Sequence, residues 1–366
     1  MLWSKVAILL FWTFFLQTDS LKYSSLDRVY QKGVEAYSNE RWSECIVQFE
    51  ESLHLYKVYK RILINCRLKC KNDARFSTIP DNIEDLKIYE LFFNTRQCLI
   101  NCNNEAFEDV HMYNNVTEST IFNMQIRKPY EYLHLCYFQM YAMPKAASAS
   151  YTFLVTNPDD PKMKKNLDYY INQPEVDINE VVDLESDDYQ ILYRLGLKSY
   201  NTKKWGETIA NMEEALNHYL SWENNCRMEC ERQPEQEWSP EITITISNYM
   251  ASHLTCKQKC QEELKPLYNS GIEFIADLLN YIQISYYNLD RLGDMGKAVA
   301  SYLLLLPEDN DMLENKKIYS TLVDDSAFVA RSDIVHYLKR DTYEKRLLSF
   351  FHQESYINDI ETNKVS

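Results

Sequence analysis

The chain has 366 residues, of which 45% are hydrophobic and 25% are charged, and this balance disfavours both wholesale disorder and a protein with many membrane spans. Only 6 residues are glycine, whereas nucleotide-binding α/β folds and β-sandwiches need glycines for phosphate loops and tight turns. The formal net charge of −15 repels phosphate backbones, so we expect no nucleic-acid partner. The composition therefore predicts an all-α protein, whose acidity either maintains solubility or attracts a basic partner.

The first twenty residues have the features of a cleavable signal peptide. Lys5 precedes an eleven-residue run, Val6–Leu16, that is apolar except for Thr13, and the small residues Thr18 and Ser20 follow it. The run is too short to span a bilayer, and no apolar stretch of bilayer-spanning length occurs later in the chain. We therefore expect a signal peptide at residues 1–20 and a lumenal or extracellular mature chain with no transmembrane segment.

The sequence contains one N-glycosylation sequon. Asn115-Val116-Thr117 is the only Asn-x-Ser/Thr triplet whose middle residue is not proline. In a secretory compartment such a triplet accepts a glycan when it lies on the surface. Asn115 is therefore a candidate glycosylation site.

The chain carries an internal duplication. One group of residues recurs at an offset of 163 positions, with Gly33, Tyr37, Trp42, Leu53 and Tyr56 matching Gly196, Tyr200, Trp205, Leu216 and Tyr219. Later matches have offsets of 160 and 158 for cysteine pairs and 149 for the group that begins at Pro158 and Pro307. We expect two homologous halves, residues 21–180 and 181–330, joined by the acidic stretch 174–188 and followed by a C-terminal tail, residues 331–366.

Each half opens with the pattern of a helical hairpin. Apolar residues fall at three-to-four spacing over residues 26–37 and again over residues 42–56, with a polar turn between them. The spacing of a glycine, a turn aromatic, a small residue and a packing side chain is typical of a tetratricopeptide repeat. These positions are Gly33, Trp42, Cys45 and Phe49 in the first half and Gly196, Trp205, Thr208 and Met212 in the second.

A second, looser hairpin follows in each half, around residues 136–158 and 286–307. We therefore expect about four hairpins stacked as an α-solenoid. The segment Ile242–Ile246 alternates like a strand, but its counterpart Glu84–Ile88 has a helical pattern. We expect both segments to be helical because they belong to the same repeat.

Eight of the ten cysteines form four Cys-x-x-x-Cys pairs. This spacing puts both thiols on one face of a helix, and a secreted, cysteine-rich chain favours disulfides. Two antiparallel helices that face each other through such pairs join the first cysteine to the last. The predicted disulfides are Cys66–Cys102, Cys70–Cys98, Cys226–Cys260 and Cys230–Cys256.

Other uses of the cysteines are less favoured. Four thiolates can bind zinc, but zinc ribbons commonly space their cysteines by two residues, and an oxidising lumen favours disulfides. A thioredoxin-like redox site needs Cys-x-x-Cys at a helix N-terminus in a βαβ unit, and neither is present. Cys45 occupies the small-residue position of the first hairpin, where a buried thiol and a bridge are both open, and Cys136 is equally open.

Repeated Cys-x-x-x-Cys pairs on tetratricopeptide-like helices, in two tandem halves behind a signal peptide, resemble the leprecan family. That family comprises the collagen prolyl 3-hydroxylases and their non-catalytic relatives. The resemblance covers the chain from Leu26 to Arg346. The family's enzymes also contain an iron and 2-oxoglutarate dioxygenase domain, whose metal site needs a His-x-Asp (or Glu) motif and a distal histidine.

We find no catalytic machinery of this or another common kind. Motifs of nucleotide-binding proteins, serine hydrolases and zinc proteases are absent. The seven histidines are dispersed and none begins a His-x-Asp motif: His54, His111, His134, His218, His253, His336 and His352. We therefore expect no enzymatic activity, no cofactor, and no catalytic, cofactor-binding or metal-binding residue, as in a non-catalytic family member.

Tyrosine is abundant, with 28 residues. Tyrosine rings can stack on proline rings and hydrogen-bond to the carbonyls of a polyproline II ligand, so a tyrosine-lined groove would suit proline-rich chains. Tetratricopeptide repeats also use aromatics for internal packing, and we expect Tyr37, Tyr56, Tyr200 and Tyr219 to belong to the core. For Tyr286, Tyr287 and Tyr302 both roles are open.

The resemblance implies a helper role in collagen biosynthesis. A non-catalytic member would be a scaffold of the collagen prolyl 3-hydroxylation complex in the endoplasmic reticulum, binding a prolyl 3-hydroxylase, a cyclophilin-type peptidyl-prolyl isomerase and unfolded procollagen chains. The alternatives are the substrate-binding part of a prolyl 3-hydroxylase without its catalytic domain, and an adaptor for collagen lysyl hydroxylation. Residues Asn363–Ser366 carry no Lys-Asp-Glu-Leu-type retention signal, so we expect free protein to reach the extracellular matrix.

Overall fold

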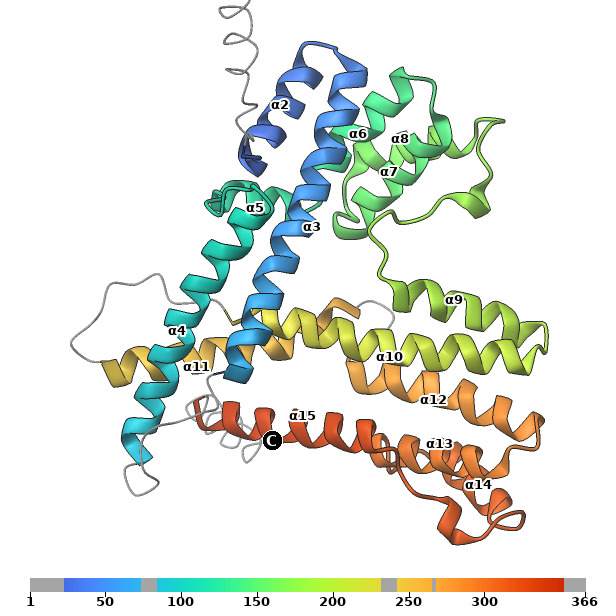
Figure 1. The fold of residues 1–366 in the computed structure, drawn as a ribbon. Helices are drawn as coiled ribbons and strands as arrows, with labels where there is room; N and C mark the ends of the chain where they lie inside the picture. The colour runs from blue at the N-terminus through green and yellow to red at the C-terminus, as the bar shows by residue number, and fades with distance from the viewer. Residues whose placement is uncertain (1–22, 74–83, 232–241, 265–267, 352–366) are drawn as a thin grey trace, which may run out of the picture. The chain divides into compact units, whose positions relative to one another are not determined.

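The computed structural model describes residues 23–73, 84–231, 242–264 and 268–351 (Figure 1). Within these ranges the chain forms helices and no strand, apart from an isolated β-bridge between Ser24 and Met112. The contacts divide the chain into two units, Met1–Glu185 and Ser186–Ser366, each with its own hydrophobic core. The expected all-α, tetratricopeptide-like fold in two tandem halves is confirmed. The signal peptide expected at residues 1–20 lies outside the described residues.

The first unit consists of two hairpins and a long stapled helix pair. Helices α2 and α3 form the first hairpin, α6 and α7 form the second, and α4 runs back along the second half of α3 (Figure 1). The short helix α5 leads into α6, and α8 packs on α7. The bounds are α2 (Leu26–Ser38), α3 (Trp42–Asp73), α4 (Glu84–Asp109), α5 (Glu118–Gln125), α6 (Lys128–Gln139), α7 (Met143–Thr156), α8 (Pro161–Ile171) and the 3-10 turn η1 (Ile178–Glu180).

The second unit repeats this plan. Its hairpins are α9 with α10 and α12 with α13, and α11 follows α10 as α4 follows α3. The prediction that residues 84–88 and 242–246 are helical is confirmed. The bounds are α9 (Asp188–Asn201), α10 (Trp205–Glu229), α11 (Ile242–Lys259), η2 (Cys260–Leu264), α12 (Gly271–Asn288), α13 (Leu292–Leu305), α14 (Asn310–Tyr319), η3 (Asp325–Ala327) and α15 (Ser332–Phe351).

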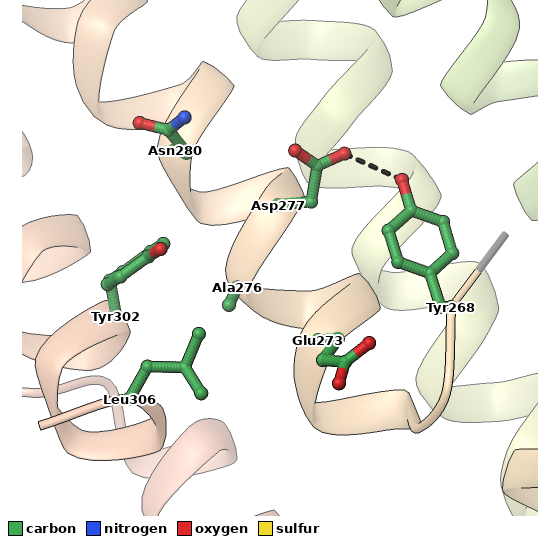
Figure 2. Close-up of a pocket in the computed structure, with 7 residues that line it drawn as sticks. All are labelled: Tyr268, Glu273, Ala276, Asp277, Asn280, Tyr302 and Leu306. Carbon is green, nitrogen blue, oxygen red and sulfur yellow. Dashed lines mark hydrogen bonds between the residues drawn. The ribbon is translucent and has the colours of Figure 1, made fainter. Parts of the chain in front are cut away.

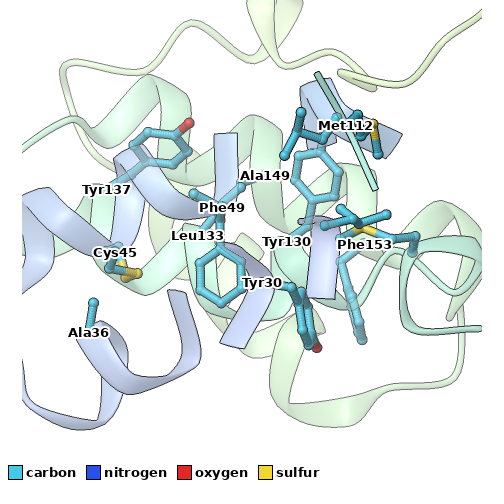
Figure 3. Close-up of a cluster of buried hydrophobic side chains, with 14 of the residues drawn as sticks. Tyr30, Ala36, Cys45, Phe49, Met112, Tyr130, Leu133, Tyr137, Ala149 and Phe153 are labelled. Carbon is cyan, nitrogen blue, oxygen red and sulfur yellow. A yellow bond between two sulfur atoms is a disulfide. The ribbon is translucent and has the colours of Figure 1, made fainter. Parts of the chain in front are cut away.

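The first core shows how the repeat residues pack (Figure 3). Phe49 of α3 is fully buried and lies edge-on to Tyr30 of α2 at a ring distance of 5.8 Å. A Cβ atom at Gly33 would lie 3.0 Å from the Phe49 ring. Gly33 therefore lets α2 and α3 approach closely, and Gly196 does the same against Met212 in the second unit.

The scarcity of glycine does not prevent tight turns. The turn of each of the four hairpins contains one residue with positive φ between 56° and 59°, and none of the four is glycine: Glu40, Tyr141, Lys203 and Asp290. A left-handed conformation at a residue with a side chain costs roughly 1 kcal/mol. The recurrence of this turn at all four hairpins shows that hairpin packing compensates for that cost.

The segment expected as a C-terminal tail, residues 331–366, begins with α15, which belongs to the second core. Ile334 and Tyr337 are buried there. Arg340 pairs with the fully buried Glu223 of α10, and Gln261 donates a hydrogen bond to Asp341 at 3.0 Å. Helix α15 is therefore an integral part of the unit, and residues 352–366 lie outside the described part.

Candidate binding site

Both units contain a helix pair that is stapled twice by disulfides. In the first unit Cys66 is bonded to Cys102 and Cys70 to Cys98, between α3 and α4. In the second unit Cys226 is bonded to Cys260 and Cys230 to Cys256, between α10 and the α11–η2 segment. This is the antiparallel pairing derived from the sequence. Sulfurs that are bonded to each other are not available as thiolates, which excludes the zinc alternative at these cysteines.

A fifth disulfide occurs only in the first unit. Cys45 of α3 and Cys136 of α6, both completely buried, are bonded with a Cα–Cα distance of 6.4 Å. The sequence left a buried thiol and a bridge open, and the structure has the bridge. The corresponding residues of the second unit are Thr208 and Ser285, whose hydroxyls donate to carbonyls of their own helices.

Several polar and aromatic contacts are duplicated between the units. The Tyr137 hydroxyl donates to Glu50 at 2.7 Å, and its repeat partner Tyr286 donates to Glu213 at 3.2 Å. The ring pairs Tyr37–Tyr132 and Tyr200–Tyr281 are both edge-to-face, with centroid distances of 5.0 and 4.9 Å. These tyrosines hold hairpins together, so much of the tyrosine content is structural.

The tyrosines expected in the core differ in their burial. Tyr219 is fully buried and packs against Phe274 with ring centroids 5.0 Å apart. Tyr37, Tyr56 and Tyr200 are only half-buried. One edge of each of these three rings therefore reaches the surface of its unit.

A pocket of about 340 Å³ lies in the second unit (Figure 2). Its walls come from α12, from the end of α13 and from the segment that precedes α12. The lining residues are Tyr268, Glu273, Ala276, Asp277, Asn280, Tyr302 and Leu306. This volume is at the lower end of the range for ligand pockets, roughly 300–1,000 Å³, and suits a side chain or a small group.

Local helix chemistry places the acidic residues of the pocket. Ser270 caps α12 by accepting a hydrogen bond from the Glu273 N–H, and the Glu273 carboxylate accepts from the Asn269 N–H at 3.0 Å. This reciprocal arrangement fixes Glu273 in the first turn, where a negative charge is favoured by the helix dipole. Asp277 and Asn280 follow at helical spacing and line the same pocket.

Tyrosine hydroxyls orient the second carboxylate. One oxygen of Asp277 accepts hydrogen bonds from Tyr193 at 2.6 Å and from Tyr268 at 2.7 Å. Burial and these hydrogen bonds raise the pKa values of both tyrosines, so their hydroxyls stay protonated as donors. Tyr302 donates in the same way to Asp309 at 3.0 Å, and burial raises the pKa of Tyr302 to about 12.

The first unit does not reproduce this acidic pocket. At the offset of 149 positions, Asp277 corresponds to Lys128 and Asn280 to Glu131. Lys128 forms an ion pair with Glu131. Of the lining residues, sequence reasoning singled out only Tyr302 and left its role open. The reversal of charge between Asp277 and Lys128 was a signal that could have indicated the acidic ones.

The geometry of the described residues shows no metal-binding cluster, since no group of three or more of their His, Cys, Asp or Glu side chains is arranged to hold a metal ion. Sequence reasoning missed one partial match: His352 and Glu354 have the His-x-Glu spacing, and no histidine follows them in the sequence. Both residues lie outside the described ranges. The buried His134 contacts the Tyr170 hydroxyl at 3.0 Å within the first core.

The sequon lies on the surface of the first unit. Asn115 is exposed in the segment between α4 and α5. The Thr117 hydroxyl caps α5 by accepting a hydrogen bond from the Thr120 N–H, and it donates a hydrogen bond to Asp27 at 2.8 Å. The folded chain therefore leaves the Asn115 side chain accessible while it engages the threonine of the same sequon.

Comparison with known proteins identifies the family. The family model "Leprecan family TPR-like repeat region" matches residues 25–323, which include both stapled helix pairs. The chain belongs to the leprecan family. The resemblance inferred from the cysteine pairs is confirmed.

This leprecan chain is similar to both short and long curated proteins. It is 29% identical to cartilage-associated protein of Mus musculus over 347 residues, covering 92% of the chain and 85% of that protein. It is 27% identical to endoplasmic reticulum protein SC65 of Homo sapiens, covering 89% of the chain and 78% of that protein. Prolyl 3-hydroxylase 1 of Mus musculus is 27% identical, with 88% of the chain aligned to 47% of the hydroxylase. The chain thus spans about half the length of that enzyme.

None of the described helices combines the length and the apolar character that crossing a bilayer demands.

Proposed function

We propose that this leprecan chain is a non-enzymatic scaffold of the collagen prolyl 3-hydroxylation complex in the endoplasmic reticulum. It holds a prolyl 3-hydroxylase and a cyclophilin-type peptidyl-prolyl isomerase near unfolded procollagen chains. The observation that carries this proposal is the alignment with cartilage-associated protein, a non-catalytic leprecan member, over 85% of that protein's length. The alignment with SC65 supports a location in the endoplasmic reticulum.

The stapled helix pairs suit a scaffold. Two disulfides across one helix pair restrict how its helices can separate, so each pair presents a fixed surface rather than a flexible arm. The pocket of the second unit adds fixed tyrosine and carboxylate groups that can contact an extended peptide. Rigid elements and a formed pocket reduce the entropy lost when a partner binds.

Affinity purification from cells that make collagen tests the proposal. The tagged chain should retain a prolyl 3-hydroxylase, and its secretion into the medium should fall when that hydroxylase is co-expressed. Retention of a lysyl hydroxylase alone would favour the adaptor for lysyl modification. Equal secretion with and without the prolyl 3-hydroxylase would contradict the scaffold.

A second candidate is the substrate-binding part of a prolyl 3-hydroxylase. It is favoured by the similarity to prolyl 3-hydroxylase 1 and by the spacing of His352 and Glu354. The test is to read the transcript beyond the codon of Ser366. An in-frame continuation that supplies the distal histidine of a dioxygenase metal site would support this candidate, and a stop codon directly after Ser366 would contradict it.

A further inference from the structure

We propose that the pocket of the second unit binds the cationic side chain of a lysine or arginine carried by an extended, proline-containing peptide. The proposal rests on the proposed function, because it names the part of an unfolded procollagen chain that this pocket recognises. The reasons are the charge of the pocket, its aromatic walls, its size and the different residues at the equivalent positions of the first unit.

Within the described part of the second unit, no ion pair neutralises the carboxylates of the pocket. Glu273 and Asp277 line it, and Asp309 accepts the hydroxyl of the lining Tyr302. The hydrogen-bond donors found on these carboxylates are neutral tyrosine hydroxyls and amide groups. None of the three carboxylates takes part in an ion pair within the described residues. A ligand that enters therefore meets a negative potential that the described side chains leave uncompensated.

The walls match a cation on an aliphatic stem. Tyr268 and Tyr302 flank the two carboxylates, and their hydroxyls are committed to Asp277 and Asp309, which fixes the rings (Figure 2). Ring faces attract an ammonium or guanidinium group, and Leu306 and Ala276 offer apolar contact to methylenes. A metal ion fits less well, because the described acidic residues include no group of three or more arranged for coordination.

The duplicated fold provides an internal comparison. The first unit has the same hairpin plan, but Lys128 stands where Asp277 stands in the second unit and is paired with Glu131. The packing role of this position is therefore compatible with either charge. One carboxylate oxygen of Asp277 accepts the Tyr193 and Tyr268 hydroxyls, and the other oxygen, which accepts no hydrogen bond from the described residues, is assigned to a ligand of the second unit.

Peptide binding to the full secreted chain tests the inference. The probes are two single-stranded peptides of Gly-Pro-Pro triplets, one with a central arginine and one with glutamine in its place, and affinity is measured by fluorescence anisotropy at low salt. The wild-type chain should bind the arginine peptide roughly tenfold more tightly, which is the order expected for one hydrogen-bonded charge pair. Raising the salt concentration should reduce that preference.

Variants locate the effect. Asp277→Asn keeps an oxygen for the two tyrosine hydroxyls and should remove most of the preference, and Asp277→Lys, which copies the first unit, should reverse it. The matched control is Glu314→Gln, which removes one negative charge from an exposed position of α14 and should leave the preference unchanged. Circular dichroism checks that each variant is folded.

The outcomes separate this inference from the scaffold function. Equal affinity of the wild-type chain for the two peptides, or no binding of either, overturns the pocket assignment. If Glu314→Gln lost the preference for the arginine peptide to the same extent as Asp277→Asn, the preference would be an effect of net charge, and the pocket assignment would also be overturned. None of these results touches the scaffold function, which depends on whether a prolyl 3-hydroxylase co-purifies with the chain.

Discussion

The disulfide found only in the first unit makes a prediction that the second unit helps to design. Cys45 and Cys136 are separated by 91 positions, and their counterparts are Thr208 and Ser285. The double variant Cys45→Thr, Cys136→Ser therefore installs residues that the same hairpin geometry already accommodates. Each new hydroxyl can donate to its own helix, as Thr208 and Ser285 do, so no buried donor is left unpaired.

The expected cost follows from the loop that the bridge closes. The bridge Cys66–Cys102 lies inside that loop and shortens it, so the chain-entropy model gives a loss of about 4 kcal/mol in the unfolding free energy of the first unit. Because about 1.4 kcal/mol corresponds to a tenfold change in an equilibrium constant, the slowest amides of α3 and α6 should exchange about a thousandfold faster.

Hydrogen exchange followed by mass spectrometry is the assay, since it reports the two units separately. Amides of α9 and α12 are the control and should not change, and the mass of the folded chain should show that the other four disulfides remain. Acceleration by less than about tenfold would refute the chain-entropy reasoning. Equal acceleration in both units would refute the independence of the two cores.

Three further predictions follow from the repeat residues. Gly33→Ala should destabilise the chain by about 1–2 kcal/mol because the new Cβ meets a ring, and Gly196→Ala should cost less because it meets a flexible methionine, as urea unfolding would show. Burial lowers the pKa of His134 to about 4 from 6.5, so the unfolded chain takes up the proton first. The free energy of unfolding of the first unit should therefore be at its full value above pH 6.5 and should fall by about 3 kcal/mol as the pH drops from 6.5 to 4. The variant His134→Gln, which copies Gln283 of the second unit, should abolish this fall. Asn115→Gln should remove an endoglycosidase-sensitive mobility shift from the secreted chain, and an unchanged shift would refute glycosylation there.

The acidic stretch between the halves was predicted to be the linker, and the structure shows that its end packs on the first unit. Asp183 forms an ion pair with Arg127 at 3.0 Å, and the Leu184 N–H donates to Thr152 at 2.8 Å. In the second unit the Arg331 N–H donates to Ser301, which corresponds to Thr152 in the repeat. The sequence indicated a boundary through its composition, but only the fold shows that this segment is fastened to the first unit.

The sequence by itself determined the fold class, the duplication and four of the five disulfides. Cysteines four apart on one helix share a face, and two such pairs on antiparallel helices can join in only one order without crossing. Local periodicity was enough, because each of these features depends on neighbours along one helix or on a hairpin of adjacent helices.

Tertiary structure alone decided the features that join distant elements. Cys45 and Cys136 have no second cysteine four positions away on their helices, so no spacing rule pairs them and their bond depends on how α3 packs on α6. The carboxylate of Asp277 meets Tyr193 and Tyr268 from different parts of the second unit, and no spacing rule relates these three positions. Helical periodicity fixes which face a residue occupies, whereas the partner of that face is set by packing between helices.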